Sequence, residues 1–439
     1  MKHIINLEKY FHSLGKKEYI KKNYTLDDIR LALKYLSNPQ NRLKNIIHIT
    51  GTNGKGTVAI YTSKILHSLG YKVGLFISPH IYDVTERIQL NNKQINEKIL
   101  IDYLRKVYET VPKQIFKRLT YFELLTCVMF LYFADNQPDY TVMEVGLGGK
   151  LDATNVVDNS IVSCITSISL DHTEVLGKTE FDIVKDKSAI IKPNSIFICG
   201  EVKSKIKEFL YKLCKKLNTK FVYIPKDEVN FSFVPEKWGT LCKIFSFNTE
   251  VEFSIQGCSV IQPYNLLLSL KIVENALGNN YTIVTQKLDD VVNSINKTIL
   301  PCRMQRIKIG RIEAIIDGAH NPAAVRNFVL TMQKLSLRDI VICITLMKEK
   351  DYKKIFTELS LLKDIITQVI VYKLPTPRCQ DTTILYNEAK KHFGNKVEKF
   401  DNIKIMLTYL LKFSKQTKIF FIGSFYSLLF LSLSFKNYE

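Results

Sequence analysis

Gly51-Thr52-Asn53-Gly54-Lys55-Gly56-Thr57, the 51–57 loop, is the stretch of this 439-residue chain that decides its fold. It lies between IIHI (46–49), which predicts a buried strand, and VAIYTSKILHSLG (58–70), which predicts a helix. Glycines let the backbone turn tightly, so that N–H groups at the helix start can face an anion. Lys55 adds a charge for terminal phosphates, and the Thr57 hydroxyl suits Mg²⁺. A glycine-rich turn without a ligand is the alternative, but the strand–loop–helix context favours nucleotide phosphate.

Outward from this loop, short β-branched strands alternate with amphipathic helical stretches. Further buried strands are expected at 71–77, 139–145 and 160–168, and a helix is expected to start near Thr120. This alternation predicts an α/β protein with a mostly parallel sheet. A weaker and more polar stretch follows at about 215–260, where further strands are expected.

A second strand–helix series begins after LPCRMQRI (300–307). The restart places a domain boundary near residue 298 and predicts two domains, 1–297 and 298–439. Near the C-terminus, the apolar run Phe420–Phe435 is too short and too interrupted to span a membrane easily. It predicts a buried strand followed by a packed helix.

Composition excludes several classes of protein. With 46% hydrophobic and 24% charged residues, the chain is neither collagen, nor a disordered tail, nor a polytopic membrane protein. Nine dispersed cysteines form no CxxC pair, which favours reduced thiols over disulfides or a zinc site. The N-terminus has no apolar core of signal-peptide length, so a cytoplasmic location without membrane association is expected.

The net charge of +20 permits binding to nucleic acid, to a membrane surface or to an anionic substrate. The basic clusters are short and flanked by apolar residues, and no aromatic–basic motif accompanies them. The charge therefore predicts a solvated basic surface and no nucleic-acid partner.

Polar side chains stand at the ends of two predicted strands. Glu144 ends the strand at 139–145, and Asp171 and His172 end a later apolar stretch. Ligands gather at the carboxyl ends of strands in open α/β sheets. Together with Thr57, these ends favour a shared Mg²⁺ site. The alternatives are that Glu144 caps a loop and that His172 is structural.

An ordered set of blocks resembles the folylpolyglutamate synthase/dihydrofolate synthase family of the Mur ligase superfamily. The resemblance runs from about residue 25 to about residue 430 and is carried by GTNGKGT (51–57), SPHIYDVTERI (78–88), TYFE (120–123), EVGLGGKLDATN (144–155), LDHTEVLGKT (170–179), IIK (190–192), PCRMQ (301–305), DGAHNP (317–322) and IGSFYS (422–427).

The resemblance implies a P-loop Mur-ligase-type ATPase domain with a parallel-rich sheet, plus a smaller Rossmann-like C-terminal α/β domain. It implies an ATP-dependent ligase that activates the carboxylate of dihydropteroate or folyl-(poly)glutamate as an acyl phosphate and joins it to the amine of L-glutamate. Implied ligands are ATP as co-substrate and two Mg²⁺ ions, with small molecules as the only partners and a monomeric state.

Site residues follow from the same resemblance. The residues that it assigns to ATP binding are Asn53, Gly54, Lys55, Gly56, Asn265, Arg303 and Asp317. Magnesium ligands are Thr57, Glu144 and His172, and the catalytic set is Lys55, His172 and a carbamylated Lys187. The folate substrate is assigned to Ser78, Pro79, His80, Thr120, Tyr121, Phe122, Glu123, Leu151, Asp152 and Ala153. His320 and Asn321 are placed at the closing interface, and Lys348 and Asp351 match a C-terminal block only in part.

Several hypotheses about the function stay open. LDATN, SPHI and TYFE favour a bifunctional enzyme, with a monofunctional folylpolyglutamate synthase as the alternative within the family. A P-loop NTPase associated with nucleic acid is the alternative from another class. A ligase for peptidoglycan precursors would share the fold, but the folate-side blocks argue against it.

Overall fold

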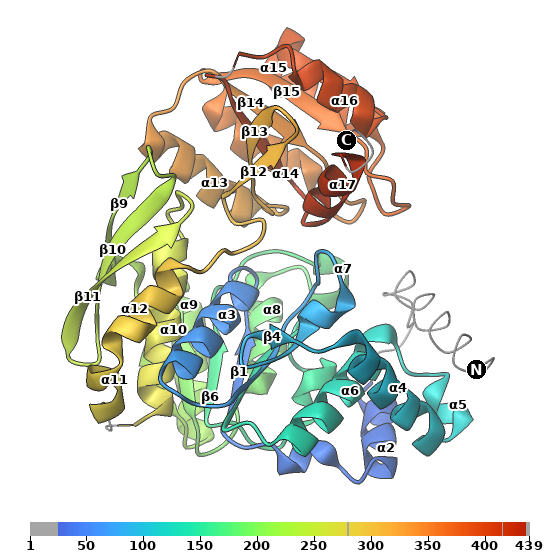
Figure 1. Ribbon diagram of the computed structural model, residues 1–439, viewed down its shortest axis with the longest axis vertical. Coiled ribbons are helices and arrows are strands. Elements are labelled where there is room, and N and C mark those ends of the chain that lie inside the picture. The colour runs from blue at the N-terminus through green and yellow to red at the C-terminus, as the bar shows by residue number, and fades with distance from the viewer. Residues whose placement is uncertain (1–24, 279–280, 415, 436–439) are drawn as a thin grey trace.

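The computed structural model of the protein describes residues 25–278, 281–414 and 416–435. Its described strands form an eight-stranded, a three-stranded and a six-stranded sheet. In Figure 1 the eight-stranded sheet lies in the lower part of the molecule and the six-stranded sheet in the upper part. The molecule is therefore built from two α/β units, in agreement with the predicted fold class.

The eight-stranded sheet has the order β4-β3-β2-β5-β1-β6-β7-β8. Strands β2, β5, β1, β6, β7 and β8 are parallel, and β3 and β4 add an antiparallel edge. The bounds are β1 Ile46–Thr50, β2 Val73–Phe76, β3 Ile88–Leu90, β4 Lys93–Gln94, β5 Tyr140–Glu144, β6 Val162–Ile165, β7 Ile196–Cys199 and β8 Lys220–Tyr223. The central strands are buried along their whole length, as a parallel sheet covered on both faces requires.

Helices cover both faces of this sheet. Ile47 and Ile49 of β1 belong to the apolar cluster that contains side chains of α3 and α10, whereas Ile46 joins the cluster of α2, α4 and α6. Alternation along β1 therefore sends neighbouring side chains to opposite layers. The helices are α2 Asp27–Tyr35, α3 Lys55–Ser68, α4 Glu97–Thr110, α5 Lys113–Phe116, α6 Tyr121–Asn136, α7 Thr173–Leu176, α8 Glu180–Lys187, α9 Ser204–Lys216, α10 Gln262–Ala276, α11 Thr282–Gln286 and α12 Leu288–Asn296.

The polar stretch at about 215–260 forms the antiparallel three-stranded sheet. Its strands are β9 Asn230–Val234, β10 Gly239–Ser246 and β11 Thr249–Gln256, in the order β11-β10-β9. Residues of β10 and β11 alternate between buried and exposed, so only one face packs on the protein. The indole Nε1–H of Trp238 donates to the carbonyl of Met304 over 2.7 Å, which ties this sheet to the start of the second unit.

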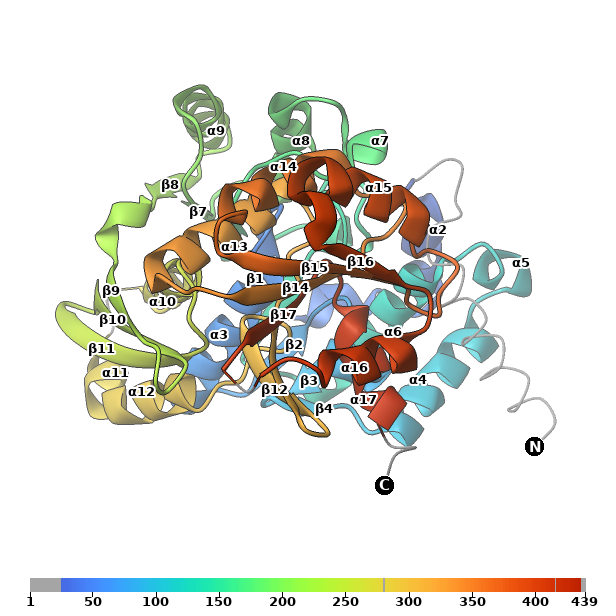
Figure 2. The same cartoon turned by 90° about the horizontal axis from the view of Figure 1, so that it is seen from above.

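The six-stranded sheet has the order β12-β13-β17-β14-β15-β16, with β12 antiparallel to β13 and the others parallel. Figure 2 shows α13 and α14 on one side of it and α16 and α17 on the other. The bounds are β12 Gln305–Ile309, β13 Ile312–Ile316, α13 Pro322–Leu335, β14 Ile340–Ile344, α14 Tyr352–Leu359, β15 Ile366–Tyr372, α15 Thr382–Phe393, β16 Val397–Phe400, α16 Ile403–Leu410, β17 Lys418–Ile422 and α17 Tyr426–Phe435.

Most predicted elements are present, with small shifts at their ends. The first described helix runs from Asp27 to Tyr35, with Leu26 at its N-terminal cap. The apolar run near the C-terminus forms strand β17 and helix α17, as expected. All nine cysteines are buried and unpaired. Within residues 25–278, 281–414 and 416–435, no helix has the length and apolarity needed to cross a bilayer.

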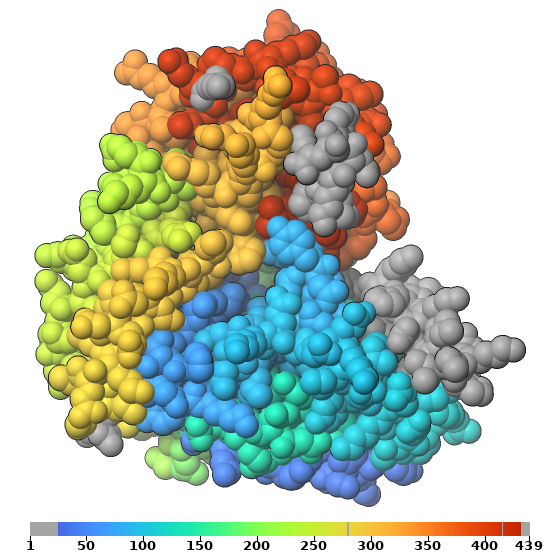
Figure 3. All heavy atoms as spheres, in the orientation of Figure 1, coloured from blue at the N-terminus to red at the C-terminus, as the bar shows by residue number. Residues whose placement is uncertain are grey.

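The two α/β units touch through the segment that follows β2. Ile81 is buried in the apolar cluster of Cys302, Ile316, Phe421 and Leu428, which belong to the second unit. Figure 3 shows this light-blue segment reaching up to the orange and red part of the surface. The segment thus closes one side of the space between the units.

Candidate active site

The 51–57 loop joins β1 to α3, which begins at Lys55. Gly54 has φ +88° at the helix N-terminus, and a Cβ there would lie 2.7 Å from the Asn265 side-chain oxygen. Only glycine fits this position without strain. The Lys55 ammonium bends back and donates to the carbonyls of Gly51 and Thr52 over 3.1 and 3.4 Å. The loop therefore places a lysine and a row of backbone N–H groups at one helix end, which suits phosphate.

Glu144 ends β5 beside this loop. Its Oε2 accepts a 2.8 Å hydrogen bond from the backbone N–H of Ser78, and it lies 3.2 Å from the place a Cβ of Gly56 would take. Burial raises the pKa of this carboxyl to about 7, although the charge of Lys55 opposes the rise. A buried carboxylate next to a phosphate-binding loop is a site that gains from a cation.

The residues predicted to hold magnesium fit such an ion. Thr57 and Glu144 are buried and line the same cavity as His172. Burial lowers the pKa of His172 to about 4, so its ring is neutral at pH 7 and free to coordinate a metal. Within the part of the chain that the structure describes, no three His, Cys, Asp or Glu side chains converge as a complete metal site. Mg²⁺ takes few protein ligands and completes its shell with water and phosphate oxygens.

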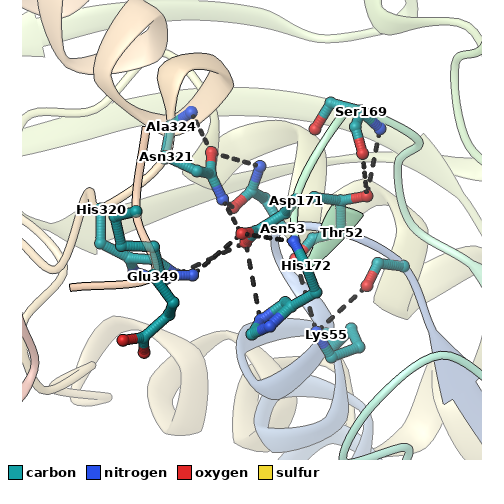
Figure 4. Close-up of polar contacts among 12 residues, drawn as sticks. Thr52, Asn53, Lys55, Ser169, Asp171, His172, His320, Asn321, Ala324 and Glu349 are labelled. Atoms are coloured by element: carbon teal, nitrogen blue, oxygen red, sulfur yellow. Dashed lines mark hydrogen bonds and ion pairs between the residues drawn. The ribbon is translucent and has the colours of Figure 1, made fainter. Parts of the chain in front are cut away.

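Asp171 connects the two units (Figure 4). Its carboxylate accepts from Lys350 Nζ over 2.9 Å and from Asn321 Nδ2 over 3.0 Å, and His320 Nε2 lies 3.7 Å away. Burial alone would raise the pKa of Asp171, but His320, Lys350 and His172 hold it well below its usual range. Asp171 is therefore an anion of the first unit that is held by groups of the second.

A pair of amides reinforces this contact. Asn321 Nδ2 donates to Asn53 Oδ1 over 3.0 Å, and Asn53 Nδ2 lies 3.3 Å from Asn321 Oδ1. Asn321 also caps α13 by accepting from the N–H of Ala324. The 51–57 loop is thus attached to the N-terminus of a helix of the second unit.

The predicted nucleotide residues of the second unit lie at the opposite wall. Arg303 stacks over the ring of Phe425 at 4.5 Å. Asp317 accepts from the backbone N–H groups of Met304 and Ala319, each over 2.9 Å, and so fixes two turns at once. Asn265, the predicted nucleotide residue of α10, belongs instead to the first unit and lies beside Gly54; it is buried and donates to Gln262 over 3.0 Å.

The segment after β2 is held mainly by Glu86. Its carboxylate accepts from the backbone N–H groups of Ile81, Tyr82 and Asp83 over 2.7–2.8 Å. Arg87 is buried and donates from Nε to the Nδ1 atom of His80 over 2.9 Å. These contacts shape the loop that carries the predicted substrate residues Ser78, Pro79 and His80.

The TYFE block opens α6 as a capping box. Thr120 accepts from the N–H of Glu123, and the carboxylate of Glu123 accepts from the N–H of Thr120 over 2.7 Å. Phe122 faces the cavity, whereas Tyr121 is buried in the apolar cluster of α2, α4 and α6. Two residues of the block therefore have a structural role that needs no ligand.

The loop of residues 146–155 follows β5 (the 146–155 loop below). Asp152 is buried, accepts from the N–H of Leu147 over 2.9 Å and caps the short helical turn that begins at Ala153. Leu151 is 45% exposed and lines the cavity, so its apolar side chain is open to a ligand. The loop presents one apolar and one acidic residue to the same space.

One cavity of about 720 Å³ brings these groups together. Its wall includes Lys55, Glu144 and Leu151 from the first unit and Arg303 and Lys350 from the second. A cavity of this size accommodates a nucleotide-sized ligand and leaves room for a second group. It joins the 51–57 loop, the acidic end of β5 and an apolar wall.

Comparison with known proteins places the chain in a family. Residues 49–273 match the family model "Mur ligase middle domain", and residues 302–425 match "Mur ligase, glutamate ligase domain". A dihydrofolate synthase/folylpolyglutamate synthase of Buchnera aphidicola is 30% identical over 436 residues, covering 97% of each chain. The chain belongs to the dihydrofolate synthase/folylpolyglutamate synthase family of Mur ligases. The dihydrofolate synthetase of Saccharomyces cerevisiae is 34% identical over 323 residues, covering 70% of this chain and 72% of the relative.

Solved structures of the family share the fold. A Mycobacterium tuberculosis folylpolyglutamate synthase complexed with ADP superimposes with a TM-score of 0.84 at 26% identity, covering 97% of this chain and 98% of that one. A bifunctional folylpolyglutamate synthase/dihydrofolate synthase of Yersinia pestis has a TM-score of 0.79 at 21% identity, covering 99% and 98%.

The structure gathers most of the residues that the family resemblance implies. Apart from the partly matching Lys348 and Asp351, all of them line the cavity except His80, Tyr121 and Asn321. His80 is bonded to Arg87, Tyr121 packs in the core, and Asn321 bonds to Asn53 and Asp171. The roles assigned to individual residues in the dihydrofolate synthase/folylpolyglutamate synthase family stay predictions for this chain.

Sequence reasoning missed Lys350. The C-terminal block directed attention to Lys348 and Asp351, but Lys348 is exposed and Asp351 caps α14. Lys350 instead reaches Asp171, 179 residues away in the chain. The partner of Lys350 depends on the packing of the two units, so no local signal in the sequence identifies it.

Proposed function

We propose that this chain is an ATP-dependent ligase that joins the amine of L-glutamate to the carboxylate of dihydropteroate or of a folyl-(poly)glutamate. The observation that carries the proposal is the single cavity in which the 51–57 loop, Glu144 and the 146–155 loop face Arg303 and Lys350 of the second unit. An ATP site and an acceptor site that share one enclosed space allow a phosphoryl group to pass directly between them.

The chemistry requires an activated acid, because a carboxylate is a poor electrophile. An oxygen of the acceptor carboxylate attacks the γ-phosphorus of ATP, which gives an acyl phosphate and ADP. The neutral amine of glutamate then attacks the acyl carbon, the C–N bond forms, and inorganic phosphate leaves with the C–O bond electrons. The amine proton goes to solvent or to a nearby base.

Residues of the chain contribute mainly by position and charge. Lys55 and the backbone of the 51–57 loop hold the phosphates, and Arg303 approaches them from the second unit. The contacts of Asp171 with Lys350 and Asn321 hold the units together and limit the access of water. Exclusion of water matters because an acyl phosphate hydrolyses readily.

Two magnesium ions belong to this proposal. Thr57, Glu144 and His172 would hold one ion, and a carbamylated Lys187 would help hold the second. When bound, Mg²⁺ neutralises phosphate charge during the transfer. The presence of AMPPNP and Mn in the Yersinia pestis relative and of ADP in the Mycobacterium tuberculosis relative supports a nucleotide with a divalent metal.

Carbamylation of Lys187 is supported by its surroundings. The residue ends α8, is 3% exposed, and lies directly against Gly149, where a Cβ would come within 2.9 Å of its Cα. Burial, helped by the charge of Lys55, lowers the pKa of Lys187 to about 7. A large share of the amine is therefore neutral at physiological pH, and a neutral amine adds to CO₂ to give a carbamate and a proton.

The proposal is tested by phosphate release with ATP, Mg²⁺ and L-glutamate, with dihydropteroate and a reduced folate compared as acceptors. Products are read by mass as glutamate additions. Turnover with both acceptors identifies a bifunctional enzyme, and turnover with the reduced folate alone identifies a folylpolyglutamate synthase. Release with neither acceptor, but stimulated by nucleic acid, would overturn the proposal.

A monomeric state and a cytoplasmic location complete the proposal. Sedimentation at increasing protein concentration tests the first, and fractionation of cells tests the second.

A further inference from the structure

Strand β1 carries two buried polar side chains on the face that bears the 146–155 loop. His48 and Thr50 alternate with Ile47 and Ile49, which pack on the opposite layer. Thr50 Oγ1 donates to the carbonyl of Gly148 over 2.6 Å. Two residues earlier in the strand, His48 Nε2 lies 2.8 Å from Thr154 Oγ1. Both hydrogen bonds attach the 146–155 loop to strand β1.

The direction of the hydrogen bonds can be worked out from the chemistry of the groups. Thr154 Oγ1 lies 2.5 Å from Asp152 Oδ1, which also accepts from the Thr154 N–H over 3.0 Å. The other oxygen of Asp152 accepts from Leu147. Burial raises the pKa of Asp152, whereas the hydrogen bonds from Thr154 and Leu147 favour its ionised form. An ionised carboxylate only accepts, so the single hydroxyl hydrogen of Thr154 points to Asp152. The hydroxyl must then accept from His48, which therefore carries its proton on Nε2.

The rest of the imidazole agrees with this tautomer. His48 is fully buried, and among the described residues its Nδ1 atom has no hydrogen-bond partner. Burial lowers the pKa of His48 to about 3, so the ring stays neutral in the physiological range. An unpaired ring nitrogen in the interior costs free energy that a leucine would avoid. The bond to Thr154 is the contact that a leucine could not replace.

We propose that His48 is a positioning residue for the acceptor substrate. It donates through Nε2–H to Thr154, which donates to Asp152, and the relay fixes the Asp152 carboxylate at the cavity wall. Because His48 and the 51–57 loop belong to one continuous segment, the same strand places the nucleotide loop and the acceptor loop relative to each other. The substrate part of this inference rests on the proposed ligase function.

Replacing His48 with glutamine or with asparagine distinguishes the hydrogen bond that it donates to Thr154 from packing alone. The Nε2 of a glutamine can reach the place of the imidazole Nε2, whereas the shorter asparagine reaches only the place of Nδ1. His48→Asn is therefore expected to raise the KM for dihydropteroate roughly tenfold, and His48→Gln to restore it to within about threefold of the unaltered enzyme. The KM for ATP should stay unchanged in both variants.

A double-mutant cycle tests whether His48 affects the KM for dihydropteroate through Asp152. In an Asp152→Asn background, His48→Asn should change the KM for dihydropteroate less than twofold, because the end point of the relay is already altered. A full tenfold effect in that background, or equal rises in the KM values for ATP and dihydropteroate, would overturn the inference.

Two measurements test the relay without any turnover. Nitrogen-15 NMR should show His48 as the Nε2–H tautomer with no titration between pH 5 and 8, the resonance being assigned by its loss in His48→Gln. Hydrogen exchange at the amides of Leu147 and Thr154 should accelerate in His48→Asn but not in His48→Gln. An Nδ1–H tautomer, or unchanged exchange, contradicts the relay.

These readouts separate the inference from the proposed function. If the unaltered protein turns over neither acceptor, the ligase proposal fails and the substrate role of His48 fails with it. The tautomer and the amide exchange then still decide whether the relay exists. If turnover is normal and His48→Asn has an unaltered KM, the inference alone is wrong. Should His48→Asn not fold, His48→Gln and the tautomer of the unaltered protein carry the test.

Discussion

At the scale of single residues, charge is concentrated on a few buried side chains. Asp171 and Lys350 are 10% and 7% exposed at the side chain and join the two α/β units. His320 adds to this cluster: its Nδ1 lies 2.7 Å from the Gly318 carbonyl, and its Nε2 faces Asp171. A buried charge that loses its partner costs far more than an exposed one. We therefore expect replacement of these residues to lower activity measurably.

Replacement of Lys350 tests this contact. Lys350→Met removes the cation that pairs with Asp171 and is expected to lower kcat/KM roughly 10- to 100-fold, because closure leaves the carboxylate unpaired. Steady-state kinetics with saturating ATP measure the change. Lys348→Met is the matched control, since Lys348 is exposed on the same segment, and it should leave kcat/KM within about twofold of the unaltered enzyme. Equal losses in both variants would contradict the role given to Lys350.

Lys187 offers a second test at this scale. Lys187→Ala should be inactive and should regain part of its activity when a small carboxylate is added in excess, because the anion takes the place of the carbamate. Lys185→Ala on the same helix is the control, since Lys185 is exposed and lies over the ring of Phe181. Full activity of Lys187→Ala without added carboxylate would show that no carbamate is needed.

At the scale of elements, the site is built where helices begin. The 51–57 loop opens α3, the TYFE block opens α6, and Asn321 caps α13. Each N-terminus leaves backbone N–H groups free for a side chain or an anion. In α6 and α13 the side chain of the N-terminal cap accepts a hydrogen bond from one of these N–H groups. Helix α3 has no side-chain cap and starts at Lys55. Of these three helices, α3 is the one with N–H groups left for phosphate.

Gly54 tests the start of α3. Gly54→Ala combines a left-handed backbone with a contact of 2.7 Å to Asn265, and it should weaken ADP binding at least tenfold. Isothermal titration with ADP and Mg²⁺ measures the affinity. Gly394→Ala is the control: its φ is also positive, at +59° with a ψ of −128°, so an alanine is strained there too, but nothing lies within 4 Å of the added Cβ. Both variants should lose stability, and only Gly54→Ala should lose affinity.

At the scale of the whole molecule, two α/β units enclose one cavity, and the segment with Ile81 bridges them. The chain as a whole carries a net charge of +20. A positive field attracts ATP and folyl polyglutamates, both of which are polyanions, and salt screens it. We therefore interpret the basic charge as an aid to the capture of small anionic substrates.

The salt dependence of the reaction tests this interpretation. Raising NaCl from roughly 50 to 500 mM should lower kcat/KM severalfold, and more for a triglutamylated folate than for a monoglutamylated one. Steady-state rates at constant ATP and Mg²⁺ measure both. Identical salt slopes for the two acceptors would assign the basic surface no part in substrate capture.

Local chemistry made much of the fold predictable. The strand before the 51–57 loop, the helix after it and the capping box at Thr120 and Glu123 all depend on residues a few positions apart. Such elements follow from side-chain periodicity and from the free N–H groups of helix ends, so the sequence predicts them with small errors at their bounds. The placement of Thr57, Glu144 and His172 around one cavity is predictable too, since strand ends of a parallel sheet meet at one edge.

The sequence by itself determined the α/β class, the 51–57 loop and most of the cavity wall, because these depend on local propensity and on motifs of short span. Only the tertiary structure decided which distant groups pair. Asn53 meets Asn321 across 268 residues, Lys350 meets Asp171 across 179, and His48 meets Thr154 across 106. No local pattern encodes these contacts, because each depends on how two elements that are distant in sequence pack against each other.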